Sequence, residues 1–193
     1  MKFTNLFYTF VLKFLVLFFV FYYGTKLMSG LATRGGYYSP FIHTYLDYVS
    51  WLRGSLVHGG AYVAALFGYS TEILSEFVLK VVDGKGVFVS YGCAGYGVMS
   101  FWAAFVLANK LPIKKKASWL LGGLLLLWGI NVTRIGLFLV AINKGWPMPL
   151  GLNHHTWFNI FAYLAIFTLM YFFDKQLKHS DADSDISSNS LHN

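Results

Sequence analysis

A succession of long apolar segments constrains this chain more than any other feature. Residues 117–142 form the longest segment, with Asn131, Thr133 and Arg134 as its polar interruptions. A helix rises about 1.5 Å per residue, so a segment of this length can cross a hydrocarbon core about 30 Å thick. Three further apolar runs occupy residues 5–23, 97–111 and 157–173. With 56% hydrophobic and 12% charged residues, the chain is predicted to be an integral membrane protein.

A fifth segment, residues 45–67, is only moderately apolar because Arg53 and His58 lie within it. Arginine at the centre of a membrane helix costs about 2.5–3.5 kcal/mol on insertion scales. We therefore expect this segment to lie on the outer surface as an amphipathic helix. The alternative is that it crosses the membrane and that the N-terminus lies outside.

The expected fold is all-α, a polytopic membrane helix bundle with four to five transmembrane helices and an active site on its outer face. Residues 1–178 form a single integral membrane domain. Residues 179–193 consist mainly of Ser, Asp and Asn, which leaves little to bury, and they are predicted to be a disordered polar tail. The alternation of apolar and polar residues over 86–90 predicts a short extended segment before Cys93.

The distribution of lysines predicts the orientation of the bundle. Lysines at positions 110 and 114–116 form the densest short basic loop, and such loops face the cytoplasm. The span over residues 97–111 then starts at the outer face, which places Cys93 there. Arg134 lies roughly 26 Å along the next span, close to the same face. The net charge of +7 is dispersed between apolar segments, which argues against nucleic-acid binding.

Cys93 is the only cysteine and hence the best candidate for chemistry, because a lone thiol has no disulfide partner in the chain. It lies at the start of an apolar run, where unpaired backbone N–H groups and the helix dipole favour a thiolate. Gly92, Gly95 and Gly97 would let a substrate approach closely and could donate N–H groups to an oxyanion. The alternative roles of Cys93 are plain packing and acylation by lipid.

Arg134 is the second candidate, because a guanidinium within an apolar span needs a partner or must reach the headgroups. Asn131 precedes it by three residues and therefore lies on the same helical face. Such a polar stripe could stabilise a thiolate, a tetrahedral oxyanion or a substrate carboxylate. Snorkelling of Arg134 to the outer headgroups is the alternative.

His154 and His155 precede the last apolar run on the same predicted face. A histidine beside a thiol is the usual general base, and later the general acid, of cysteine acyl transfer. The pair also raises the question of a metal site, but two adjacent histidines lack the helical spacing that would direct two ligands to one ion. We therefore expect no metal and no other cofactor.

Three short motifs occur in a fixed order. A Cys-x-Gly motif begins at Cys93, an Asn-x-x-Arg-Ile stretch begins at Asn131, and His155 precedes the last span. Together, over roughly residues 60–173, they resemble the archaeosortase/exosortase family of membrane-embedded sorting enzymes. The position four after the histidine, usually glycine in that family, is Asn159 here, and this spacing selects His155 over His154 as the matching histidine.

The resemblance implies a cysteine peptidase or transpeptidase in the cell membrane, with its active site on the outer or periplasmic side. Its substrate would be an exported protein whose C-terminus carries a short motif, a transmembrane helix and a basic cluster. Cys93 would form a thioester, His155 would move the protons, and Arg134 would hold the oxyanion or the thiolate. Asn131 would have a supporting role. Water or an amine-bearing acceptor would then resolve the thioester.

Two other roles fit the same residues. In a non-enzymatic membrane subunit, such as a scaffold or transporter component, Arg134 would pair with a partner helix and Cys93 would merely pack. In a lipid-modifying enzyme, Cys93 would carry an acyl group. In each case membrane lipid surrounds the chain.

Overall fold

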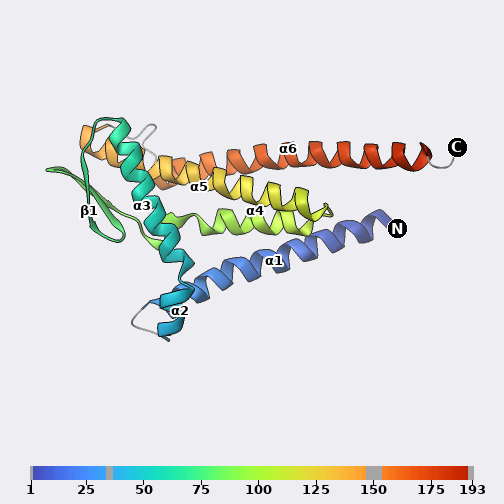
Figure 1. The fold of residues 1–193 in the computed structure, drawn as a ribbon, viewed down its shortest axis with the longest axis horizontal. Helices are drawn as coiled ribbons and strands as arrows, with labels where there is room; N and C mark the ends of the chain where they lie inside the picture. The colour runs from blue at the N-terminus through green and yellow to red at the C-terminus, as the bar shows by residue number, and fades with distance from the viewer. Residues whose placement is uncertain (1, 34–36, 147–153, 191–193) are drawn as a thin grey trace.

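The computed structural model describes residues 2–33, 37–146 and 154–190. The fold is mostly helical, and four of its helices, α1, α4, α5 and α6, pack side by side (Figure 1). The helices and the 3₁₀ turn η1 have the following bounds: α1 Lys2–Ala32, α2 Pro40–Tyr45, α3 Tyr48–Leu66, η1 Tyr91–Ala94, α4 Tyr96–Ala108, α5 Ile113–Lys144 and α6 His154–Ser190.

A small antiparallel sheet lies between α3 and η1 in the chain, so the expectation of an all-α fold is wrong in this detail. Its strands are β1 (Thr71–Ser75), β2 (Val78–Val81) and β3 (Gly86–Phe88), in the order β1-β2-β3. The predicted extended segment before Cys93 is β3. Apolar and polar residues alternate over too few positions in these strands to give a clear strand pattern, so the sequence as a whole favours helices.

Two helices of the described part are long and apolar enough to cross a membrane, namely α1 over Phe7–Ala32 and α5 over Ile113–Lys144. Helix α4 is apolar but has only 13 residues. At about 1.5 Å per residue it covers about 20 Å, less than the thickness of a bilayer core. Gly95 separates η1 from the start of α4, and Pro112 is the N-cap of the next helix, α5. The apolar run at 97–111 therefore forms a shorter helix than expected.

Helix α3 crosses one end of the bundle and does not run alongside the other helices (Figure 1). Asp47 caps its first turn by accepting a hydrogen bond from the Ser50 N–H at 3.1 Å. Its buried side packs mainly on α5. The two helices approach closely because Gly60 faces Ile135 and Gly136 faces Val63, where a Cβ atom would lie within 2.8 Å and 2.5 Å of these side chains.

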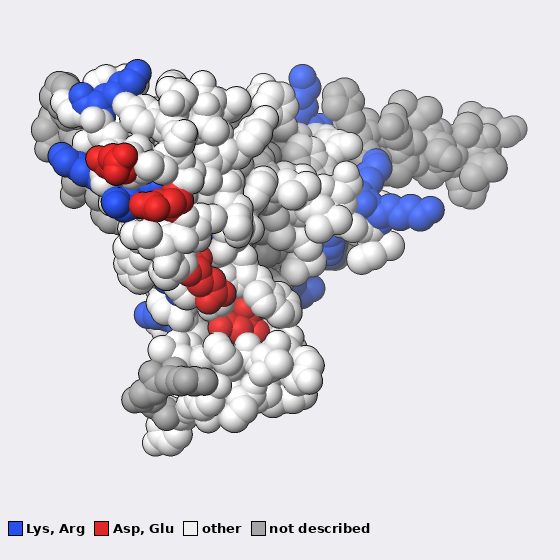
Figure 2. Space-filling model, turned by 60° about the vertical axis from the view of Figure 1, so that its left-hand side comes forward, with Lys and Arg blue, Asp and Glu red and all other residues white. Residues whose placement is uncertain are grey.

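Two apolar clusters fill the interior. The first, called here the sheet-end cluster, joins α3, the sheet and α5 around Leu56, Leu79 and Leu139. The second, the aromatic cluster, joins α4, α5 and α6 around Trp102 and Phe173. Figure 2 shows both acidic and basic side chains over the sheet and α3, basic ones toward the opposite end, and an uncharged region between them.

Helix α6 continues to Ser190, into the segment predicted to be a disordered tail. Disorder of residues 179–193 stays a prediction from composition.

Candidate active site

Cys93 lies in η1, in the short connection between β3 and α4. The Cys93 N–H donates to the Ser90 carbonyl at 2.9 Å, which closes the turn. Gly95 then has a positive φ of 72°, a left-handed conformation that glycine adopts without strain, and serves as the N-cap of α4. Gly95 thus shapes the exit from the turn.

The N–H groups near the thiol include that of Gly97, which the sequence already suggested as a donor to an oxyanion. That of Cys93 is occupied by Ser90. The first turn of α4 begins at Tyr96, and helix geometry leaves its N–H groups without intrahelical acceptors. These groups, including that of Gly97, are the better candidates for binding an oxyanion.

Asn131 and Arg134 on α5 both bind the main chain of Cys93. Asn131 Nδ2 donates to the Cys93 carbonyl oxygen at 2.8 Å, and Arg134 Nη2 donates to the same oxygen at 3.2 Å. Asn131 is only 1% exposed, and its Oδ1 has no hydrogen-bond partner within the described part of the chain. The structure thus brings together three of the predicted site residues.

The Cys93 thiol is half-buried against the sheet-end cluster. Ser90 Oγ donates a hydrogen bond to its Sγ at 3.4 Å, which orients the sulfur. The Arg134 guanidinium lies close by, since its Nη2 donates to the Cys93 carbonyl oxygen at 3.2 Å. The sulfur therefore contacts a hydroxyl of its own turn, and a cation from α5 binds the main chain of the same residue.

A second arginine, Arg53 on α3, holds the segment that enters the turn. Its Nε and Nη2 both donate to the Val89 carbonyl, at 2.9 Å and 2.7 Å. Its guanidinium lies over the ring of Phe77 at 3.5 Å and over that of Tyr91 at 4.2 Å. Burial lowers the pKa of Arg53, and electrostatic interaction with Tyr91 and Glu76 opposes part of that effect.

The sequence did not indicate Arg53 as a site residue. It suggested only that residues 45–67, which contain this arginine, do not cross the membrane. The signal that could have found it is the one that selected Arg134. An arginine within an apolar segment requires a partner, and here the partner is a carbonyl in the turn.

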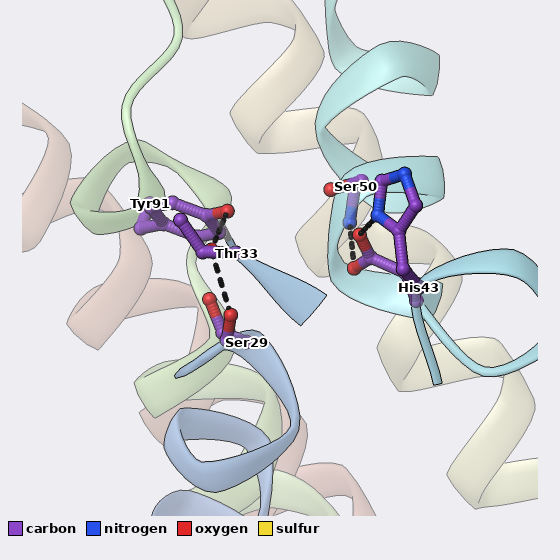
Figure 3. Close-up of polar contacts among 6 residues, drawn as sticks. Ser29, Thr33, His43, Ser50 and Tyr91 are labelled. Atoms are coloured by element: carbon purple, nitrogen blue, oxygen red, sulfur yellow. Dashed lines mark hydrogen bonds and ion pairs between the residues drawn. The ribbon is translucent and has the colours of Figure 1, made fainter. Parts of the chain in front are cut away.

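Tyr91 joins the turn to Thr33, the residue that follows α1 (Figure 3). The Thr33 hydroxyl donates to the Ser29 carbonyl at 2.8 Å, so Tyr91 OH must be the donor in its 2.9 Å hydrogen bond with Thr33 Oγ1. Helices α3 and α5, and Thr33 just after α1, therefore each contact the five-residue stretch from Val89 to Cys93.

His154 and His155 form the first residues of α6. Their side chains lie outside the described part of the structure, so the placement of either histidine beside the thiol stays a prediction. The preceding helix α5 ends at Lys144, on the side of the molecule where the sheet lies: Asn143 Oδ1 accepts from the Lys85 N–H at 2.7 Å.

A groove with a volume of about 530 Å³ runs beside the start of α4, between α1, α3 and α5. Its walls are mostly apolar and include Tyr96 and Met99, close to Cys93 in the chain, with hydroxyl groups from Thr25 and Ser55. The groove is suited to an apolar segment that continues from the turn into the bundle.

Comparisons of the chain with protein-family models, with curated proteins and with solved structures gave no match. The geometry of the turn therefore carries the functional argument.

Proposed function

We propose that this chain is a membrane-embedded cysteine peptidase or transpeptidase that cleaves the C-terminal sorting signal of exported proteins. One observation carries the proposal: the lone cysteine lies in a tight turn before a helix, and two polar residues of a largely apolar helix, Asn131 and Arg134, are directed at it. Polar side chains of this kind raise the free energy of inserting a helix into the membrane, and they are typical of functional sites.

The placement in the membrane is also part of the proposal. Helices α1 and α5 cross the cell membrane together with α6 and the shorter α4 with its flanking segments. The lysine-rich start of α5 faces the cytoplasm. The sheet, α3 and the Cys93 turn then lie on the outer or periplasmic side, where exported proteins are available.

The reaction begins when His155 takes the thiol proton and Cys93 Sγ attacks the scissile carbonyl carbon. The carbon–sulfur bond forms, and the carbonyl electrons move to the oxygen, which the first-turn N–H groups of α4 and the Arg134 guanidinium stabilise. When the tetrahedral intermediate collapses, the carbon–nitrogen bond breaks and the amine leaves with the proton from His155.

A thioester to Cys93 then remains, and an amine-bearing acceptor or water attacks its carbonyl carbon. The nucleophile gives its proton to His155, the carbon–sulfur bond breaks, and the thiolate regains the proton. We place the apolar segment of the substrate in the groove beside α4, where it would anchor the scissile bond near the turn.

The role of non-enzymatic membrane subunit is less well supported. It requires Arg134 to pair with a helix of another protein, whereas its Nη2 donates to Cys93 within this chain. Thiol chemistry on lipid remains an outcome of the test below.

Co-expression with a candidate exported protein that carries a C-terminal motif, helix and basic cluster tests the proposal. The wild type should shorten this substrate, whereas Cys93→Ala and His155→Ala should not, and Arg134→Ala should lose most of the activity. His154→Ala is the matched control and should retain activity. Cleavage that survives Cys93→Ala would refute the mechanism, and a thioester-linked lipid on Cys93 without cleavage would support the lipid chemistry instead.

A further inference from the structure

We propose that Arg53 is a positioning residue for Cys93: it binds the Val89 carbonyl at the entry to the catalytic turn, whereas Arg134 binds the Cys93 carbonyl. The inference rests on the proposed function, since it assigns Arg53 a role in that same site. Two arginines from two helices bind two carbonyls that are four residues apart, Val89 by Arg53 and Cys93 by Arg134.

The contacts of Arg53 are more specific than burial of a charge requires. It is only 2% exposed, and two of its nitrogen atoms converge on a single carbonyl oxygen. The rings of Phe77 and Tyr91, which come from the β1–β2 connection and from η1, contact its guanidinium at 3.5 Å and 4.2 Å. A flat guanidinium can stack and donate twice at once, which a lysine ammonium cannot do.

These contacts act on the residues that determine where the sulfur lies. Val89 N–H donates to the Phe77 carbonyl at 2.9 Å, so the main chain of Val89 is held both by the β1–β2 connection and by Arg53 on α3. Ser90, the next residue, closes the turn through its carbonyl and donates to the sulfur through its hydroxyl. Displacing the Val89 peptide would therefore move both groups that orient Cys93.

The substitution Arg53→Met separates positioning from folding. Methionine keeps an unbranched apolar side chain in place of the arginine stem, and the melting temperature of the variant reports any loss of stability. The Val89 carbonyl nevertheless loses both of its arginine donors. Arg53→Lys keeps the charge but loses the forked geometry, and Asn143→Ala is the matched control because it removes a helix-to-sheet contact at the far end of β3.

The first measurement is the rate at which a membrane-permeant maleimide labels Cys93, the only cysteine, in purified folded protein. Arg53→Met should speed labelling about 5- to 30-fold, because a half-buried thiol becomes accessible when its turn opens more often. Arg53→Lys should give a smaller increase, and Asn143→Ala should match the wild type. A rate for Arg53→Met equal to that of the wild type, in protein that melts at the same temperature, would overturn the inference.

The second measurement is cleavage of the substrate. Arg53→Met should lower kcat about 10- to 100-fold with KM changed by less than about twofold, because misplacing the sulfur slows chemistry and leaves substrate binding intact. A raised KM with wild-type kcat would also overturn the inference. If the wild type cleaves nothing, the proposed function fails, and the labelling rates alone decide whether Arg53 holds the turn.

Discussion

The aromatic cluster and the Cys93 turn, at two levels of the same bundle, are held by different interactions. Around Trp102, rings of Phe105, Trp119 and Phe173 pack within 6.4 Å of its ring between centroids, and the indole N–H donates to the Trp119 carbonyl. Around Cys93, arginine, asparagine and tyrosine side chains reach the turn through hydrogen bonds. Ring packing stabilises the helix assembly, whereas directed hydrogen bonds set the position of one short segment.

This difference predicts that stability and thiol position can be altered separately. Substitutions in the aromatic cluster should lower the melting temperature and leave the Cys93 labelling rate of the folded protein unchanged. Substitutions around the turn should change the labelling rate at a smaller cost in stability. The four predictions below test this separation, from the largest expected loss of stability to the smallest.

Trp102→Ala should lower the free energy of unfolding by about 3–5 kcal/mol, because it removes a fully buried indole from the aromatic cluster. Thermal melting of the detergent-solubilised protein measures the loss. Leu121→Ala, on the exposed side of α5, is the control and should melt near the wild type. A Trp102→Ala protein that melts normally would show that the cluster does not hold the bundle.

Gly123→Ala should cost about 1–3 kcal/mol through overpacking. A Cβ atom at this position would lie 2.0 Å from Trp102 Nε1, and the rigid indole would have to move. The neighbouring Gly122→Ala, whose Cβ would meet nothing within 4 Å, is the matched control. Equal melting temperatures for the two variants would contradict the packing described here.

Asn131→Ala should cost only about 1–2 kcal/mol, since the Cys93 carbonyl keeps Arg134 as a donor. Its labelling rate at Cys93 should nevertheless rise, and cleavage should fall, because one of the two groups that hold the turn on α5 is lost. Labelling at the wild-type rate would indicate that Arg134 alone positions the turn.

Thr33→Val should have the smallest effect, about 0.5–1.5 kcal/mol, because it removes one acceptor for Tyr91 OH at an exposed position. We expect a slight increase in Cys93 labelling and no change in KM. Thr168→Val, which removes an exposed hydroxyl bond within α6, is the control. A larger effect than that of Asn131→Ala would reverse the order of importance proposed for α1 and α5.

Much of the helical framework could be predicted from the sequence, because apolar runs of sufficient length have few other structures available in lipid. The spacing of Asn131 and Arg134 likewise predicted a shared face, since residues three apart lie together on any α-helix. Of the short sheet, the sequence predicted only the extended segment before Cys93, and it did not predict the two other strands. Its strands of three to five residues, Thr71–Ser75, Val78–Val81 and Gly86–Phe88, depend on pairing with each other.

The sequence by itself determined that the chain is mostly helical, that it contains apolar segments long enough to cross a membrane, and that one cysteine stands before an apolar segment. Only the tertiary structure decided what holds that cysteine. Periodicity acts within one segment, whereas the contacts of Arg53 with Val89 and of Tyr91 with Thr33 join residues 36 and 58 positions apart. Such contacts depend on how the helices pack, and no local pattern encodes them.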